Sequence, residues 1–152
     1  MIFEIKTLVN KTFHERIILS LLYFEKVSWM KFPFKVLRKV IIQFGYHCEI
    51  HPDSFIDKEA IINCSLPHPY LIIVNRRAIL GHNLRIFHGV TIGANEKGEN
   101  LVPVIRDNVY IGAGACILGG VIIGENAKIG AHSVVLSDVD PGKTACGIYK
   151  KE

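Results

Sequence analysis

The apolar positions in the second half of the chain repeat every six residues. The anchors of this pattern stand in one unbroken register at Ile105, Ile111, Ile117, Ile123, Ile129 and Val135. The same phase runs earlier through Val74, Leu80, Ile86 and Ile92. A period of six matches neither an α-helix nor an alternating strand. It is typical of a parallel β-helix built from hexapeptides, in which three hexapeptides make one coil.

A small or β-branched residue stands four positions after each anchor from Ile105 to Val135 and is expected to point inward with it. Two weaker copies of the repeat begin at Ile50 and Ile56, with Ser54 and Ala60 at the fourth offset, so the predicted solenoid covers residues 48–152. Residues 63–70 and 94–103 interrupt the register and contain proline or glycine. Insertions in repeat proteins often form the binding face, so we expect the functional site beside these two loops.

Residues 1–47 lack the repeat. Apolar residues recur at helical spacing from Phe13 to Phe24 and from Val36 to Phe44, with Pro33 between the two runs, which predicts two or three short helices. Their apolar faces are expected to cap the open end of the solenoid or to pack between subunits. The chain therefore divides into an α-helical segment, residues 1–47, and a β-helix domain, residues 48–152.

Charge is spread unevenly over these two parts. Residues 1–48 carry eight basic and three acidic residues, and the remainder carries ten and eleven. The N-terminal part mixes basic and aromatic residues, namely Lys26, Trp29, Lys31, Lys35, Arg38 and Lys39. A membrane-surface role and the solvated face of a packed helix both account for this mixture.

The chain carries no signal for export or for membrane insertion. No run approaches the roughly 18 consecutive apolar residues of a membrane helix, and no signal peptide pattern is present. The four cysteines form no closely spaced pair, so we expect reduced thiols and a cytoplasmic location. If the membrane-surface interpretation holds, that location is the inner face of the membrane, with peripheral contact.

His68 is the strongest candidate for catalysis. It lies between Pro67 and Pro69 in the first interruption, and an imidazole can accept a proton from a hydroxyl group near neutral pH. His88 follows twenty residues later, close to one coil, and is expected to stack near His68. Glu49 precedes the first repeat and is of a type that orients an imidazole. A structural or merely exposed role is the alternative for each.

Other chemistries find less support in the sequence. His82 and His88 are six residues apart, which places them on different faces of a coil and argues against a shared metal site. We therefore expect no metal cofactor. The paired glycines of residues 112–114 and 119–120 follow from the repeat rather than from a dinucleotide-binding motif. Nothing resembles a nucleic-acid-binding module, so we expect no nucleic-acid partner.

Four segments carry a more specific resemblance. They are residues 68–75 (HPYLIIVN), 86–93 (IFHGVTIG), 109–119 (VYIGAGACILG) and 127–135 (AKIGAHSVV). In order and spacing the chain resembles the serine acetyltransferase family, and more closely its short capsule, exopolysaccharide and colanic acid relatives. The resemblance covers about residues 48–149. It implies a left-handed parallel β-helix, homotrimers, and acetyl-CoA bound as co-substrate in the groove between subunits.

The resemblance also implies roles for individual residues. His68 matches the catalytic base of the family, and Glu49 falls near the aspartate that orients this base, with about four extra residues between the two. The positions implied to contact or neighbour the coenzyme are Ala94, Ala113, Ala131 and Lys128.

The chain departs from the family where serine would bind. Pro67 replaces an acidic residue before the catalytic histidine, and Leu101 and Val102 replace an Arg-His pair. Without these groups the ammonium and carboxylate of serine lose their charged partners. We therefore expect direct acetyl transfer from acetyl-CoA to a sugar hydroxyl in polysaccharide or capsule synthesis. Serine O-acetylation and a non-catalytic trimeric solenoid are the alternatives.

Overall fold

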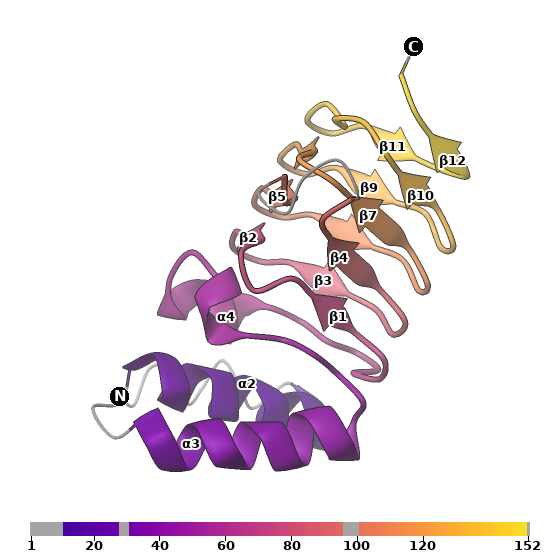
Figure 1. The fold of residues 1–152 in the computed structure, drawn as a ribbon. Helices are drawn as coiled ribbons and strands as arrows, with labels where there is room; N and C mark the ends of the chain where they lie inside the picture. The colour runs from indigo at the N-terminus through magenta and orange to yellow at the C-terminus, as the bar shows by residue number, and fades with distance from the viewer. Residues whose placement is uncertain (1–10, 28–30, 96–100, 152) are drawn as a thin grey trace.

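The computed structural model describes residues 11–27, 31–95 and 101–151. Helices lie at one end of the molecule, and a three-sided solenoid of short strands rises from them toward the C-terminus (Figure 1). The helical elements are α2 (Phe13–Val27), α3 (Lys31–Arg38), the π-helix η1 (Lys39–Gly45), the 3-10 helix η2 (Pro52–Ser54) and α4 (Lys58–Asn63).

Three parallel sheets form the sides of the solenoid. Sheet A contains β1 (Ile73–Val74), β4 (Thr91–Gly93), β7 (Cys116–Leu118), β10 (Val134–Val135) and β12 (Ile148–Tyr149). Sheet B contains β2 (Ile79–Leu80), β5 (Val104–Ile105) and β8 (Ile122–Ile123). Sheet C contains β3 (Arg85–Ile86), β6 (Tyr110–Ile111), β9 (Lys128–Ile129) and β11 (Thr144–Ala145).

The chain visits the three sheets in turn, so each strand pairs with the strand of the next coil. Tyr110 pairs with Lys128, eighteen residues away, as three hexapeptides require. Thr91 pairs with Cys116, twenty-five residues away, because the loop of the second interruption lies between them. Together with the structural similarities described below, this pairing confirms the predicted left-handed parallel β-helix of hexapeptide repeats.

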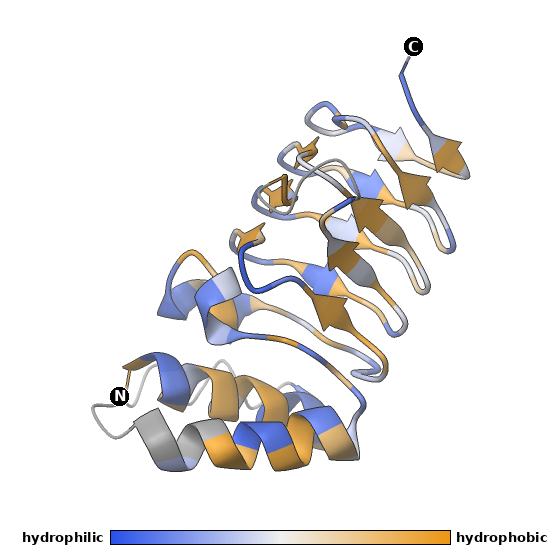
Figure 2. Cartoon of the chain, viewed as in Figure 1, coloured by the Kyte–Doolittle hydropathy of each residue, from blue (hydrophilic) through white to orange (hydrophobic). Residues whose placement is uncertain are grey.

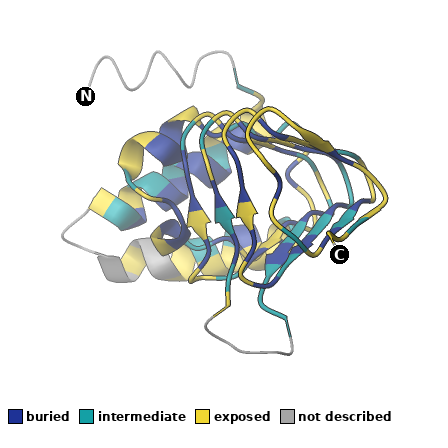
Figure 3. Cartoon of the chain, turned by 90° about the horizontal axis from the view of Figure 1, so that it is seen from above, coloured by how far each residue is buried: buried dark blue, intermediate teal, exposed yellow. Residues whose placement is uncertain are grey.

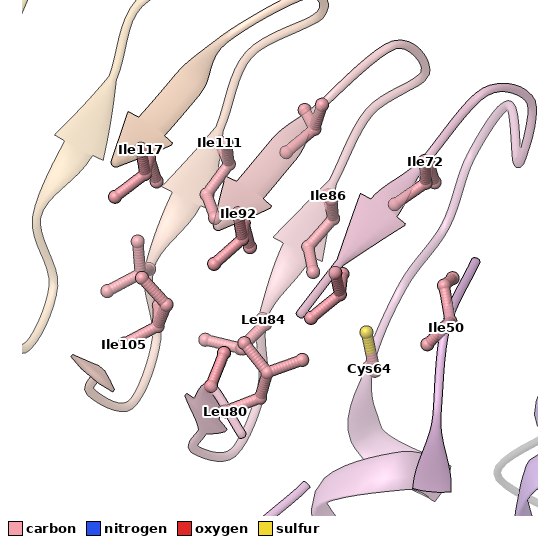
Figure 4. Close-up of a cluster of buried hydrophobic side chains, with 14 of the residues drawn as sticks. Ile50, Cys64, Ile72, Leu80, Leu84, Ile86, Ile92, Ile105, Ile111 and Ile117 are labelled. Atoms are coloured by element: carbon pink, nitrogen blue, oxygen red, sulfur yellow. The ribbon is translucent and has the colours of Figure 1, made fainter. Parts of the chain in front are cut away.

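The predicted anchors form the core of the solenoid. Every anchor from Val74 to Val135 is buried, as are the small or β-branched residues four positions later from Ala78 to Val139. The side chains labelled in Figure 4 come from all three sheets and point toward one another. Figure 3 shows the same alternation from above, with buried segments inside the coils and exposed segments outside. Burial of one such isoleucine contributes about 1.5–3 kcal/mol to folding.

One corner of the coil depends on residues that tolerate a left-handed backbone. Between sheets B and C, the turn residue of successive coils has a positive φ at Asn83, Asn108, Asn126 and Gly142. Asparagine adopts this conformation at lower cost than other side chains except glycine. The amide N of Asn126 donates to Asp107 O at 3.0 Å, so these turns also carry hydrogen bonds between coils.

The N-terminal helices cap the open end of the solenoid, as expected. Ile18, Leu19 and Leu22 of α2 are buried and belong to the same hydrophobic cluster as Ile50 and Ile61. In Figure 2 the helices alternate apolar and polar stripes, whereas the strands of sheet A are largely apolar. The amphipathic helices therefore cover apolar surface that the first coil would otherwise expose to water.

The first coil differs from the prediction. Ile56, expected as a buried anchor, is 58% exposed, and Phe55 (2% exposed) takes the interior position instead. Ala60 is buried as expected, but within α4 rather than in a strand. Asp57 caps this helix, since its Oδ1 accepts a hydrogen bond from Ala60 N at 2.8 Å. The extra residues between Glu49 and His68 thus form a helix, and regular strands begin only at β1.

Candidate active site

The corner between sheets C and A carries both candidate histidines. The chain leaves sheet C at β3, turns through residues 87–90 and enters sheet A at β4. Hydrogen bonds link the successive turns of this corner: Gly89 N donates to Tyr70 O (2.9 Å), Gly114 N to His88 O (2.9 Å) and His132 N to Ala113 O (2.8 Å). These bonds place Ala113 and Ala131 in line with His88 along the solenoid axis.

His68 lies at the start of this corner, in the loop that precedes β1. Its ring is exposed, and its centroid is 6.1 Å from that of His88 and 6.5 Å from that of Phe87. The expected proximity of the two histidines is therefore confirmed. Proline on both sides limits the backbone of His68, and its carbonyl accepts a hydrogen bond from Tyr70 N at 2.8 Å. The imidazole is open to a substrate while its backbone is restrained.

A buried thiol supports the loop from inside. Cys48 Sγ donates to Pro69 O at 3.6 Å and accepts from Ile72 N at 3.3 Å. Burial raises the pKa of Cys48 above its ordinary value, and it raises that of Cys64 to about 12. Both thiols therefore stay protonated near neutral pH. They pack in the core and are unsuited to nucleophilic catalysis.

Glu49 does not join His68 in the single chain. Its backbone pairs with sheet A, where Glu49 N donates to Ile72 O at 2.8 Å, and its exposed side chain borders a hollow of about 340 Å³. Arg38, Lys39 and Arg76 line the same hollow. Among the residues that the structure describes, neither a hydrogen bond nor an ion pair connects Glu49 with His68. Their pairing remains a prediction.

The positions implied to contact the coenzyme lie in two regions. Ala113 is half-buried and Ala131 is exposed, both on the corner that carries His88. Lys128 is exposed on β9 of the adjoining sheet C, next to Tyr110. Ala94 follows β4 at the opposite edge of sheet A, where the second loop begins. Residues 96–100 of that loop lie outside the described residues.

Two aromatic side chains beside His68 were not predicted as part of the site. The rings of Phe87 and Tyr110 lie 5.3 Å apart, and the guanidinium carbon of Arg85 stands 5.3 Å from the centroid of Phe87. These side chains come from neighbouring strands of sheet C or from the turn after it. Their clustering depends on strand pairing across twenty-five residues, which the six-residue pattern alone does not assign to particular side chains.

His82 lies between two aspartates and has a structural role. His82 Nε2 lies 3.0 Å from Asp57 Oδ2, and its Nδ1 lies 3.2 Å from Asp107 Oδ1. The hydrogen bond with Asp57, followed by the one with Asp107, raises the pKa of His82 despite partial desolvation. In the part of the chain that the structure describes, no three His, Cys, Asp or Glu side chains converge as a metal site.

Comparison with known proteins agrees with this arrangement. Residues 103–137 match the bacterial transferase hexapeptide (six repeats) family. The chain is 39% identical to serine acetyltransferase of Escherichia coli K12 over 108 residues. This match covers 70% of this chain and 38% of that protein. The chain is 37% identical over 104 residues to the Helicobacter pylori 26695 enzyme, which covers 68% of this chain and 58% of that protein.

Solved structures extend the similarity to the N-terminal helices. A serine acetyltransferase in complex with cysteine superposes with a TM-score of 0.73 and 30% identity, over 94% of this chain and 58% of the other. The chain thus spans between about two fifths and three fifths of the length of these relatives.

The coil geometry and the repeat define the class of protein: the chain is a hexapeptide-repeat protein with a left-handed β-helix. Within this class it is serine acetyltransferase-like in both sequence and structure.

Proposed function

We propose that this protein is an acetyl-CoA-dependent O-acetyltransferase with His68 as its general base. The observation that carries the proposal is the exposed imidazole of His68 on the corner that also holds His88, Ala113 and Ala131. Similarity to serine acetyltransferases supports the choice of donor. One of these enzymes has been solved in complex with CoA, and it superposes with a TM-score of 0.69 and 31% identity over 90% of this chain and 54% of the other.

The proposed reaction needs no covalent acyl-enzyme. His68 accepts the proton of the acceptor hydroxyl while the oxygen attacks the thioester carbonyl of acetyl-CoA. Backbone N–H groups along the corner stabilise the oxyanion that develops. The imidazolium then protonates the departing CoA thiolate, which restores His68 and releases the acetyl ester. His88, whose ring centroid is 6.1 Å from that of His68, would lie beside the same substrates.

L-Serine is the first acceptor to test, because the relatives reported above are serine acetyltransferases. A sugar hydroxyl is the second candidate. Pro67, Leu101 and Val102 offer no charged side chain at the positions where the family engages serine. Leu101 borders a hollow of about 490 Å³ whose lining includes Leu118 and Leu136 and also the charged residues Asp138, Asp140 and Lys151.

We further propose a homotrimer with active sites between subunits. The outward residues of sheets A and B include exposed isoleucines, among them Ile73, Ile122 and Ile148, whereas the outward residues of sheet C are mainly polar or charged. Ala94, at the start of the second loop, and His68 lie at opposite edges of sheet A in one chain. A neighbouring subunit offers a way to bring such a loop to His68.

A cytoplasmic location with peripheral membrane contact completes the proposal. An apolar groove of about 530 Å³ runs along α2 and is lined by Phe13, Ile17, Phe24 and Ile41, with Arg16 at its side. Within the ranges described above, no helix combines the length and apolar character needed to cross a bilayer. Trp29, part of the expected basic and aromatic surface, lies outside the described residues.

Co-sedimentation with anionic vesicles tests the membrane contact, and protein that stays in the supernatant contradicts it.

The test of the reaction is release of CoA thiol from acetyl-CoA by the purified protein. L-Serine is compared with a panel of sugars and nucleotide sugars. His68→Ala is expected to lower turnover roughly 100- to 10,000-fold, the usual contribution of a general base, while acetyl-CoA binding persists. His14→Ala is the control, because His14 is exposed and bonds to Tyr46 away from this corner. Full turnover in His68→Ala would overturn the mechanism.

A further inference from the structure

The N-terminus of α2 forms a capping box that uses only one of the two carboxylate oxygens of Glu15. Glu15 N donates to Thr12 Oγ1 at 3.3 Å, and Thr12 N donates to Glu15 Oε2 at 2.8 Å. The second oxygen, Oε1, reaches across to the loop before His68. It accepts hydrogen bonds from Leu66 N at 2.6 Å and from Ser65 Oγ at 3.1 Å.

This contact is buried and charged. Glu15 is 4% exposed. Burial by itself would raise the pKa of Glu15, but hydrogen bonds from Thr12 N, Leu66 N and the Ser65 hydroxyl together hold it below its ordinary value. Bonds to an ionised carboxylate are stronger than those between neutral groups. The neighbouring Lys11 adds another bond, since its Nζ donates to Cys64 O. Residues 64–66 are therefore hydrogen-bonded both to Glu15 of α2 and to Lys11, which precedes the capping residue Thr12.

The link from this contact to His68 is short and stiff. Leu66 is fully buried and lies two residues before His68. Pro67 stands between them, with a φ fixed by its ring. A shift of the backbone at Leu66 is therefore passed to His68 with little room for relaxation. A general base must stay within hydrogen-bonding reach of its proton, and a displacement of about 1 Å costs on the order of 100-fold in rate.

We propose that Glu15 is a positioning residue of the active site, whose carboxylate fixes the loop at Ser65 and Leu66 so that His68 stands at the corner with His88. This inference rests on the proposed role of His68. It gives the helical segment a part in catalysis in addition to its role as the cap of the solenoid.

Glu25 supplies a matched control for the test. It lies on the same helix and is equally buried, at 4% exposed, but it accepts from Arg38 Nε at 2.7 Å and does not touch the His68 loop. Glu15→Ala and Glu25→Ala remove the same chemical group from two ends of α2. Glu15→Gln is the conservative variant, because its amide oxygen can still accept from Leu66 N.

Two measurements are made on each variant: amide hydrogen exchange of residues 64–72, and steady-state kinetics with acetyl-CoA and the acceptor that the wild type uses. Glu15→Ala is expected to speed exchange at Leu66 at least tenfold, because the Leu66 N–H loses its acceptor. It should lower kcat roughly 10- to 100-fold and leave the KM for acetyl-CoA within about twofold. Glu15→Gln should recover part of both losses. Glu25→Ala should lower Tm but leave loop exchange and kcat near the wild-type values.

The inference is overturned if Glu15→Ala leaves loop exchange unchanged, or if its kcat falls no further than that of Glu25→Ala. A wild-type protein without acetyl transfer to any acceptor overturns the proposed function, and the positioning role falls with it. Exchange at Leu66 would still show whether Glu15 holds the loop, so the two failures are distinguishable.

Discussion

Gly112 lies at a close approach of two coils beside the candidate site. A Cβ at this position would stand 2.6 Å from Ala131 N and 2.9 Å from Ala131 Cα. A Cβ at Gly93 would meet only Leu118 Cδ2, at 3.9 Å. Gly112→Ala must therefore push the coils apart, and we expect it to lower the free energy of unfolding by roughly 1–3 kcal/mol. Gly93→Ala should change it by less than about 0.5 kcal/mol. Urea denaturation of both variants measures the difference, and equal midpoints would contradict the prediction.

His82 makes stability depend on pH in a defined direction. Hydrogen bonds with Asp57 and Asp107 raise its pKa in the folded state. The protonated form is therefore favoured by folding. This contribution is complete below the unfolded pKa of about 6.5 and is lost as the pH rises through the higher folded value.

The expected result is a difference in unfolding free energy between wild type and His82→Asn that is largest near pH 6 and shrinks toward pH 9. Denaturant unfolding at several pH values measures it. Comparison with the variant removes the contributions of the other histidines. A difference that grows with pH would show that His82 is folded in its neutral form.

At the scale of elements, α4 is the departure from a regular solenoid. Asp57 makes two contacts at the start of α4. Its Oδ1 accepts a hydrogen bond from Ala60 N as the N-cap, and its Oδ2 pairs with His82 Nε2. We expect Asp57→Ala to lower the free energy of unfolding by about 1–2 kcal/mol, since it removes both contacts. Asp57→Asn keeps a capping oxygen and loses only the charge, so it should cost less. Chemical denaturation tests the order, and equal losses in the two variants would mean that the cap contributes nothing.

At the scale of the whole molecule, the outward faces of the sheets differ. Ile148 on sheet A is 79% exposed, whereas Thr144 on sheet C is an exposed polar residue in the adjacent strand of the chain. We expect the wild type to sediment as a trimer of the 17.0 kDa chain. Ile148→Asp should shift it toward the monomer, because a charge is costly to bury, and Thr144→Asp should not. A monomeric wild type in analytical ultracentrifugation would contradict the trimer.

The repeat made much of the fold predictable. All anchors from Val74 onward are buried, because the inward positions of a hexapeptide coil recur at a constant spacing that the sequence displays directly. The prediction failed at Ile56. There Phe55 pairs with the anchor Leu80 and takes the interior position, and Asp57 caps a helix directly afterwards. His68 and His88 were placed together correctly because their separation is close to one coil.

The six-residue period, the buried positions from Val74 onward, the N-terminal helices and the loop that carries His68 could be predicted from the sequence. These features depend on neighbouring residues, whose side chains alternate inward and outward by local backbone geometry. Three features are visible only in the folded chain. Glu15 accepts a hydrogen bond from Leu66 N, and the ring of Phe87 lies beside that of Tyr110. Glu49 and His68 are not bonded to each other within one chain. The first two contacts join residues 51 and 23 positions apart in the sequence, and only the packing of helix and coils sets their distances and burial.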